Sequence, residues 1–333
     1  MDAKPITTSR PENGETKSKA RFEALFDLMG RKTSRLIIYL LLFCASMAVP
    51  VFSNNYVLEV MSNVWFYVIL ALGLNIVVGY AGLLDLGYAA FFAVGAYTTG
   101  ILTAKFGVNF WLTIPVAMFF SILAGVIIGG PTLRLRTDYL AIVTLGFGEI
   151  VRIAARNLKI TGGASGLIGI ERPSIFGFEL NQIFHYYYLF FLLSVLAIFV
   201  SYRLQHSRLG RAWQYVREDE DAAEAMGIPT VRIKLYAYVT GAIFGGVAGC
   251  FFAAKMTAIS PETFMFTQSV LILLAVVLGG MGKIPGVIVG AFALVLFPEV
   301  FRSIGSLRML VFGVVLLIII IYRPQGIWPD RRD

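Results

Sequence analysis

Long apolar runs occupy most of this chain and restrict it to one class of fold. The 333 residues are 58% hydrophobic, and only 14% are Asp, Glu, Lys or Arg. A helix of about twenty apolar residues is long enough to cross a bilayer. Because a helix satisfies its own backbone hydrogen bonds in lipid, a chain with many such runs is predicted to be an all-α polytopic membrane protein.

The apolar runs predict about 10 transmembrane helices. Gly, Pro and charged residues separate one run from the next. The predicted spans are residues 36–52, 62–80, 86–104, 110–130, 139–157, 186–202, 235–254, 268–282, 285–301 and 308–322. Residues 1–35 are polar and are predicted to form a cytoplasmic tail ahead of a transmembrane domain at 36–333.

The distribution of cationic residues predicts the orientation of the chain. Loops on the cytoplasmic side of a membrane are enriched in Lys and Arg. The tail, a long polar loop at 203–234 and the C-terminal residues together hold most of the 28 Lys and Arg residues. Both termini and this loop are therefore predicted to be cytoplasmic. The net charge of +8 follows from the same asymmetry and does not indicate binding of nucleic acid.

The loop at 203–234 is a polar island between apolar runs. An uninterrupted helix is predicted over 212–226, because these residues lack Gly and Pro, and Gly227 can cap its end. Trp213, Val216, Ala223 and Met226 are predicted to share its apolar side. Five acidic residues also fall here: Glu218, Asp219, Glu220, Asp221 and Glu224. Composition leaves two alternatives, a solvated loop helix and a helix that docks on another protein.

Two similar glycine motifs follow apolar runs in the two halves of the chain. VVGYAG occupies 77–82 and VLGGMG occupies 277–282. Their recurrence suggests two related halves, as in many transporters, although glycine is also frequent wherever membrane helices pack closely. Broken helices at such sites can offer dipoles and carbonyl groups to a zwitterion. The candidate pathway residues are Gly79, Gly82, Asp85, Gly87, Gly279 and Gly282.

Ionisable residues inside the apolar runs are few. Glu149 and Arg152 are spaced to pair on one helical face, and Glu299 and Arg302 repeat that spacing. These pairs are interpreted as structural pairs or as side chains that reach toward the membrane interface, with a functional role as the alternative. Asp85 is predicted to hold a helix terminus, with substrate binding as the alternative. The two cysteines, Cys44 and Cys250, lie within apolar runs and are predicted to be buried thiols, with no metal site.

Signatures of enzymes are absent from the sequence. Gly282 and Lys283 are followed by Ile284, so they do not form a nucleotide-binding P-loop. A membrane body with a charged cytoplasmic helix and without a nucleotide site favours a permease driven by a separate ATPase. An ion-coupled secondary transporter or channel is the alternative.

Several segments resemble the LivM-type permease of branched-chain amino acid ABC importers. They occur in the family's order between about residues 36 and 330. They are LNIVVGYAGLLDLGYAAFFAVGAYT (74–98), LRLRTDYLAIVTLGFGEIVR (133–152), ITGGASGLIGIERPSIFG (160–177), GRAWQYVREDEDAAEAMGI (210–228), SPETFMF (260–266), VVLGGMG (276–282) and RPQGIWP (323–329).

The resemblance implies a subunit of a bacterial inner-membrane importer for leucine, isoleucine and valine. Relatives also serve urea, short amides or other amino acids. The implied partners are a LivH-type permease subunit, two ABC ATPase subunits and a periplasmic substrate-binding protein, with ATP and Mg on the ATPases and no cofactor on this chain. Residues 210–228 would hold the helix that contacts the ATPases. The implied coupling residues are Arg211, Arg217, Glu218, Asp219, Glu220, Ala223 and Gly227.

Overall fold

The computed structural model describes most of the chain beyond residue 53. It covers residues 46–50, 53–133, 137–175 and 178–307, together with 310, 313, 314, 317, 321, 322, 326 and 327. The chain divides into two compact units, residues 1–54 and 55–333, and the elements described here belong to the second unit. The predicted tail, most of the predicted spans at 36–52 and 308–322, and Cys44 lie outside the described residues.

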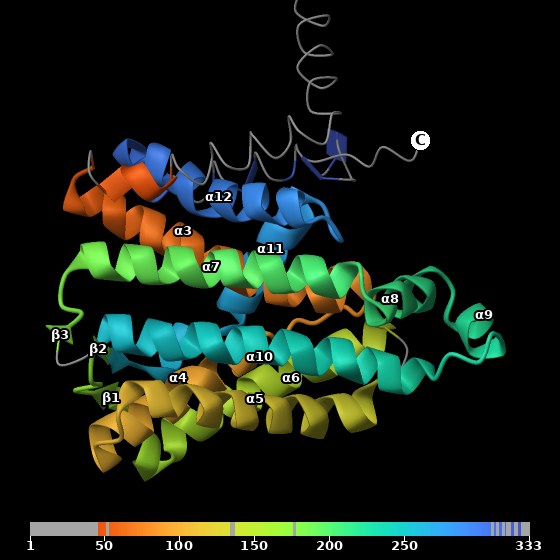
Figure 1. Cartoon of the computed structure of the whole chain (residues 1–333), viewed down its shortest axis with the longest axis horizontal. Helices are drawn as coiled ribbons and strands as arrows, with labels where there is room; N and C mark the ends of the chain where they lie inside the picture. Colours follow the sequence, from red (N-terminus) through yellow and green to blue (C-terminus); the bar gives the residue numbers. More distant parts are fainter. Residues whose placement is uncertain are drawn as a thin grey trace, which may run out of the picture. The chain divides into compact units, whose positions relative to one another are not determined.

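Helices make up nearly all of the second unit (Figure 1). The longer ones are α3 (Asn55–Leu74), α4 (Ala89–Phe106), α5 (Phe110–Thr132), α6 (Thr137–Asn157), α7 (Ile183–Gln205), α8 (Arg208–Glu218), α9 (Glu220–Ala225), α10 (Thr230–Met256), α11 (Phe266–Gly279) and α12 (Ile284–Val300). A π-helix, η1 (Asn75–Tyr80), continues α3, and the 3-10 turns are η2 (Lys159–Thr161), η3 (Gly163–Ser165), η4 (Pro261–Phe264) and η5 (Arg302–Leu307).

Two short antiparallel strand pairs lie between the helices. β1 (Leu167–Ile168) pairs with β4 (Ala258–Ile259). β2 (Ser174–Ile175) pairs with β3 (Phe178–Glu179). They add order to the long connection between α6 and α7, which is rich in glycine.

The apolar runs predicted between residues 62 and 301 all form helices. Among the described residues, six helical segments are long and apolar enough to cross a membrane. They are Asn55–Tyr80, Ala89–Phe106, Phe110–Thr132, Ile183–Gln205, Thr230–Met256 and Pro261–Gly279. The 17-residue α12 is shorter, and α6 contains Glu149, Arg152 and Arg156. The all-α polytopic class is therefore confirmed, whereas the count of ten spans and the cytoplasmic termini stay predictions.

The centre of the bundle is α10, which packs against α3, α4 and α5. Glycine permits its close approach to α4, since a Cβ atom on Gly95 would lie 1.9 Å from the carbonyl oxygen of Gly246. A Cβ atom on Gly249 would lie 2.2 Å from the carbonyl oxygen of Phe92. Cys250 of α10 is fully buried, as predicted.

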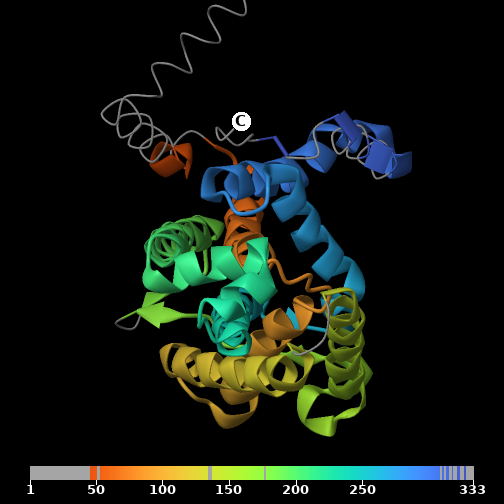
Figure 2. The same ribbon diagram turned by 90° about the vertical axis from the view of Figure 1, so that its right-hand side faces the viewer.

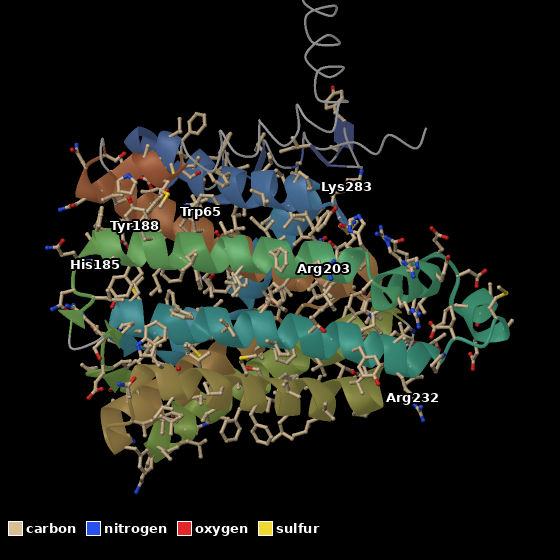
Figure 3. The ribbon with its side chains drawn as sticks, viewed as in Figure 1. Trp65, His185, Tyr188, Arg203, Arg232 and Lys283 are labelled. Carbon is tan, nitrogen blue, oxygen red and sulfur yellow. The ribbon has the colours of Figure 1, made fainter. Side chains whose placement is uncertain are left out.

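The two ends of the second unit carry different elements. α8 and α9 extend from one end, and the strand pairs lie at the other (Figure 1); Figure 2 views the unit from the α8 and α9 end. Arg203, Arg232 and Lys283 lie at the end with α8 and α9, whereas His185 and Tyr188 lie at the opposite end (Figure 3). The 203–234 loop and the turn at Lys283 thus share one end, in agreement with the charge pattern.

Candidate functional site

The polar loop forms two short helices instead of one. The Ser207 Oγ atom accepts a hydrogen bond of 3.1 Å from the Gly210 N–H and caps the start of α8. Asp219 has an extended backbone, and its Oδ1 atom accepts a hydrogen bond of 3.0 Å from the Ala222 N–H. The single helix predicted over 212–226 is therefore wrong, because the preference of Asp for the N-cap position divides it.

The end of α9 has the cap that the sequence predicts. Gly227 adopts a left-handed conformation with φ of 83°. Its N–H donates to the Glu224 carbonyl oxygen at 2.9 Å, and the Ile228 N–H donates to the Ala223 carbonyl oxygen at 3.0 Å. This pair of bonds is a Schellman motif. Of the four residues on the predicted apolar side, Met226 is 83% exposed, whereas Trp213, Val216 and Ala223 are buried.

Trp213 attaches α8 to the membrane helices. Its side chain is fully buried and lies parallel to the Tyr80 ring, with the ring centroids 6.5 Å apart. Its indole N–H donates a hydrogen bond of 2.8 Å to the Ile233 carbonyl oxygen. One aromatic side chain therefore joins α8 to both η1 and α10.

Arg217 makes a second attachment between α8 and η1. Its Nη1 atom donates a hydrogen bond to the Gly79 carbonyl oxygen. Its aliphatic part covers Gly82, where a Cβ atom would lie 2.8 Å from the Arg217 Cγ atom. Gly82 also has a φ of 71°, a conformation that residues with a Cβ atom seldom adopt. A predicted coupling residue thus contacts two predicted pathway residues.

The second glycine motif meets the first at the same place. The Gly282 N–H donates a hydrogen bond of 2.8 Å to the Asn75 Oδ1 atom, and the Gln205 Nε2 atom donates one of 3.4 Å to the Gly282 carbonyl oxygen. A Cβ atom on Gly79 would lie 2.5 Å from the Gly282 nitrogen. We call this group, which consists of Asn75, Gly79, Gly82, Gln205, Arg217 and Gly282, the glycine junction.

Gly279 has a different role from the glycines of the junction. A Cβ atom at this position would lie 2.1 Å from the Gly286 carbonyl oxygen. The absence of a side chain therefore lets α11 and α12 pack closely in their helical hairpin.

Asp85 and Gly87 form a separate cluster against α6. Asp85 is fully buried, and its Oδ1 atom accepts a hydrogen bond of 2.8 Å from the Gly87 N–H. The Leu86 N–H donates to the Thr144 Oγ1 atom at 3.1 Å, and a Cβ atom on Gly87 would lie 1.9 Å from the Thr144 carbonyl oxygen. Asp85 thus fixes the non-helical turn before α4, in agreement with its predicted structural role.

The acidic residues of α8 and α9 lie on the surface. Glu218, Asp219, Glu220, Asp221 and Glu224 are all exposed. Glu220 forms an ion pair with Lys234, whose side chain is 7% exposed. Arg211 is exposed, and its Nη1 atom lies 3.3 Å from the His206 carbonyl oxygen. Of the predicted coupling residues, Ala223 is buried and Arg217 contacts the glycine junction, while the acidic residues and Arg211 remain accessible.

Sequence analysis missed two polar members of the junction, Asn75 and Gln205. Asn75 is fully buried, and it is a polar residue within the apolar run predicted at 62–80, which was an available signal. The sequence gives no comparable indication of the bond between Gln205 and Gly282 or of the bond between Arg217 and Gly79, because both bonds join residues that are far apart in sequence.

Comparisons with known proteins place the chain in a family of permeases. Residues 56–320 match the family described as branched-chain amino acid transport system / permease component. The chain is 40% identical over 91% of its length to the high-affinity branched-chain amino acid transport system permease protein LivM of Salmonella typhimurium, and the match covers 77% of that protein.

More distant relatives include a second type of permease. The chain is 26% identical to the probable branched-chain amino acid transport permease protein LivM of Methanocaldococcus jannaschii, over 80% of this chain and 92% of that protein. It is 31% identical to the permease protein LivH of Escherichia coli, over 41% of this chain and 44% of that protein. No solved structure is significantly similar to the chain.

Proposed function

Because this chain belongs to the family of branched-chain amino acid transport permease components, we propose that it is the membrane-spanning permease of an ATP-driven importer for leucine, isoleucine and valine. The names of the similar proteins support the substrate class. The attachment of α8 to the glycine junction supports an ATP-driven mechanism most directly, because it gives an exposed acidic helix a connection to two membrane hairpins.

The partners follow from the same family. A LivH-type permease would complete the membrane domain, since such a protein is itself similar to this chain. Two ATPase subunits would bind ATP and Mg and contact the exposed surface of α8 and α9. A periplasmic binding protein would deliver the amino acid at the opposite end. We expect the chain to lie in a bacterial inner membrane, with both termini and the 203–234 loop in the cytoplasm.

Motion of α8 can reach the membrane helices through two attachments. Trp213 links α8 to η1 and α10, and Arg217 links α8 to η1 at Gly79. Asn75 then links η1 to the turn between α11 and α12. A displacement of α8 by closing ATPases would therefore act on both glycine motifs together and favour one of two arrangements of the helices.

The glycine junction also refines the proposed pathway. Gly79, Gly82 and Gly282 are occupied by contacts with Arg217 or with one another, and these contacts support a role in transmitting motion. Asp85 and Gly87 contact Thr144 of α6 instead of the glycine junction, so we retain their turn as the candidate for the substrate route.

Reconstitution tests the substrate and the energy source. The permease, its LivH-type partner, the two ATPases and the binding protein would be combined in proteoliposomes that contain ATP. We expect uptake of labelled leucine, isoleucine and valine that stops when ATP or the binding protein is omitted. Uptake of urea or acetamide instead would support the alternative substrates, and ATP-independent leucine uptake driven by an ion gradient would contradict the proposed mechanism.

Charge reversal at Glu218 tests ATPase docking. Glu218 is exposed at the end of α8, so Glu218→Lys should weaken ATPase recruitment to purified membranes without unfolding the permease. Glu220→Lys would also lose the ion pair with Lys234 and is a less specific change. Glu171→Lys, at an exposed position in the connection between α6 and α7, is the matched control. Unchanged recruitment and uptake in the Glu218 variant would remove this residue from the docking surface.

A further inference from the structure

A closed crevice lies where the start of α4 meets α6, η4 and α11. Leu86, Leu145, Phe264 and Phe266 form its apolar walls, and Glu149 and Ser269 supply polar groups. The walls are in contact and leave no room for a water molecule. The crevice adjoins the turn at Gly87, since a Cβ atom on Gly148 would lie 3.3 Å from the Gly87 Cα atom.

Glu149 belongs to an ion pair at the edge of this crevice. The Glu149 Oε2 atom lies 2.7 Å from the Arg152 Nη2 atom and 2.9 Å from the Arg152 Nε atom. The two side chains are 32% and 19% exposed, respectively. The Arg152 Nη1 atom lies 3.7 Å from the Glu262 Oε1 atom, which is too long for a good hydrogen bond. Arg152 therefore has donor capacity that Glu149 does not use.

We propose that Glu149 and Arg152 are an exchangeable contact site for the ammonium and carboxylate groups of an amino acid in transit, which rests on the proposed function. The pair presents one negative and one positive group, as a zwitterion does. The Arg152 guanidinium suits a carboxylate, because its planar fork can donate two parallel hydrogen bonds. Glu149 accepts from the ammonium group, and the apolar walls receive the branched side chain.

Exchange would make binding weak, which suits a transport route. An amino acid that enters must displace an existing ion pair, so the gain in charge interactions is offset by the loss of those between Glu149 and Arg152. Release then restores the original pair. A site of this kind neutralises the charges of the zwitterion inside the membrane without retaining it, whereas an unpaired charge would be costly there.

The crevice opens only if α6 moves away from η4. Glu262 of η4 lies 3.7 Å from Arg152 and 4.0 Å from Arg156 of α6, so two ion pairs bridge the two elements. The carboxylate of an amino acid can replace Glu262 at Arg152 and so favour separation of the walls.

The complete transporter in proteoliposomes allows the test, with leucine as the probe. Glu149→Gln and Arg152→Gln should each reduce leucine uptake by about tenfold, which corresponds to about 1.4 kcal/mol. ATPase activity stimulated by the binding protein should persist, because the glycine junction is intact in both variants. Arg152→Lys keeps the charge but lacks the planar fork, so it should also reduce uptake, and it serves as the second variant where Arg152→Gln impairs folding.

A matched pair elsewhere provides the control. Glu299 and Arg302 have the same spacing, with the Arg302 Nη1 atom 3.5 Å from the Glu299 Oε1 atom. Glu299→Gln and Arg302→Gln should leave leucine uptake unchanged. Parental uptake in the folded Glu149 and Arg152 variants, or loss of uptake together with stimulated ATPase activity, would overturn the inference. Absence of leucine uptake by the parent transporter would overturn the proposed function instead.

Discussion

The glycine junction and the crevice beside Glu149 and Arg152 are held together by different kinds of contact. At the junction, Arg217, Asn75 and Gln205 each bond to a backbone group of a glycine motif. At the crevice, side chains pair with side chains through opposite charges, as in Arg152 with Glu149 and Glu262. A backbone group keeps its position as long as its helix does, whereas partly exposed ion pairs between two side chains are screened by salt and open to competitors.

This difference matches two requirements of a transporter. An element that transmits motion needs contacts that keep their geometry while the helices move. A route for a charged solute needs contacts that can be exchanged during passage. The two regions occupy different helices, since the junction involves α8 and η1 whereas the crevice involves α6 and η4. Variants can therefore affect one region and spare the other.

The largest expected effect comes from adding a side chain where two backbones touch. The methyl group introduced by Gly279→Ala would lie 2.1 Å from the Gly286 carbonyl oxygen. The helices α11 and α12 must therefore separate. Such overpacking typically destabilises a fold by about 1–3 kcal/mol. Thermal unfolding of the purified permease should show a clear decrease in midpoint.

Gly146→Ala is the control for this change. Gly146 lies inside α6, and a Cβ atom there would have no neighbour within 4 Å. Its unfolding midpoint should stay the same or rise slightly, because Ala favours helix over Gly. Equal midpoints for the two variants would contradict the close packing of the α11 and α12 hairpin.

Arg217→Gln should have an intermediate effect, mainly on coupling. The change removes the charged hydrogen bond to the Gly79 carbonyl oxygen, and solvent weakens this bond because Arg217 is an exposed residue. We expect leucine uptake to fall while ATPase recruitment persists, because Trp213 still holds α8. Arg232→Gln, an exposed change at the same end, should leave uptake unaltered. Full uptake in the Arg217 variant would show that the junction transmits no motion.

The smallest effect is expected at the rim of the crevice beside Glu149 and Arg152. The Arg156 Nη1 atom lies 4.0 Å from the Glu262 Oε1 atom, and the Arg156 side chain is 55% exposed. Exposed pairs of this kind contribute about 0–1 kcal/mol, so Arg156→Gln should hardly change the unfolding midpoint. Any difference from the parent should shrink further at high salt. A large, salt-independent decrease would place Arg156 in a buried contact and weaken the contrast with the junction.

Sequence patterns predicted the features that depend on near neighbours. Apolar runs located the helices between residues 62 and 301, the spacing of Glu149 and Arg152 predicted their ion pair, and Gly227 was recognised as a helix cap. The ion pair and the cap depend on residues within one or two helical turns of each other, and each apolar run is a continuous stretch of sequence, so geometry is nearly fixed by spacing.

Features that depend on distant parts of the chain were not predictable in this way. Nothing near Arg217 indicates that it bonds to Gly79, and nothing near Asn75 indicates Gly282 as its partner. The break at Asp219 was missed because the prediction relied on the lack of Gly and Pro over 212–226. It gave no weight to the ability of Asp219 to cap a new helix. The predicted coupling and pathway residues were therefore found as two separate sets, although Gly79 and Gly82 of the pathway set both contact Arg217.

The π-helix η1 allows a rotation of defined size in the chain that follows it. A π-helix bonds each N–H to the carbonyl group five residues earlier, whereas an α-helix uses the fourth. Conversion of η1 to α-helical pairing would rotate the residues after Tyr80 by about 100° for each residue moved out of the segment. Asn75 and Gly79, near its two ends, are bonded to Gly282 and Arg217. The hydrogen-bond register of η1 is thus fixed by partners outside it. If one of these partners let go, the residues after η1 would rotate by a fixed angle, and the helix would not merely bend gradually.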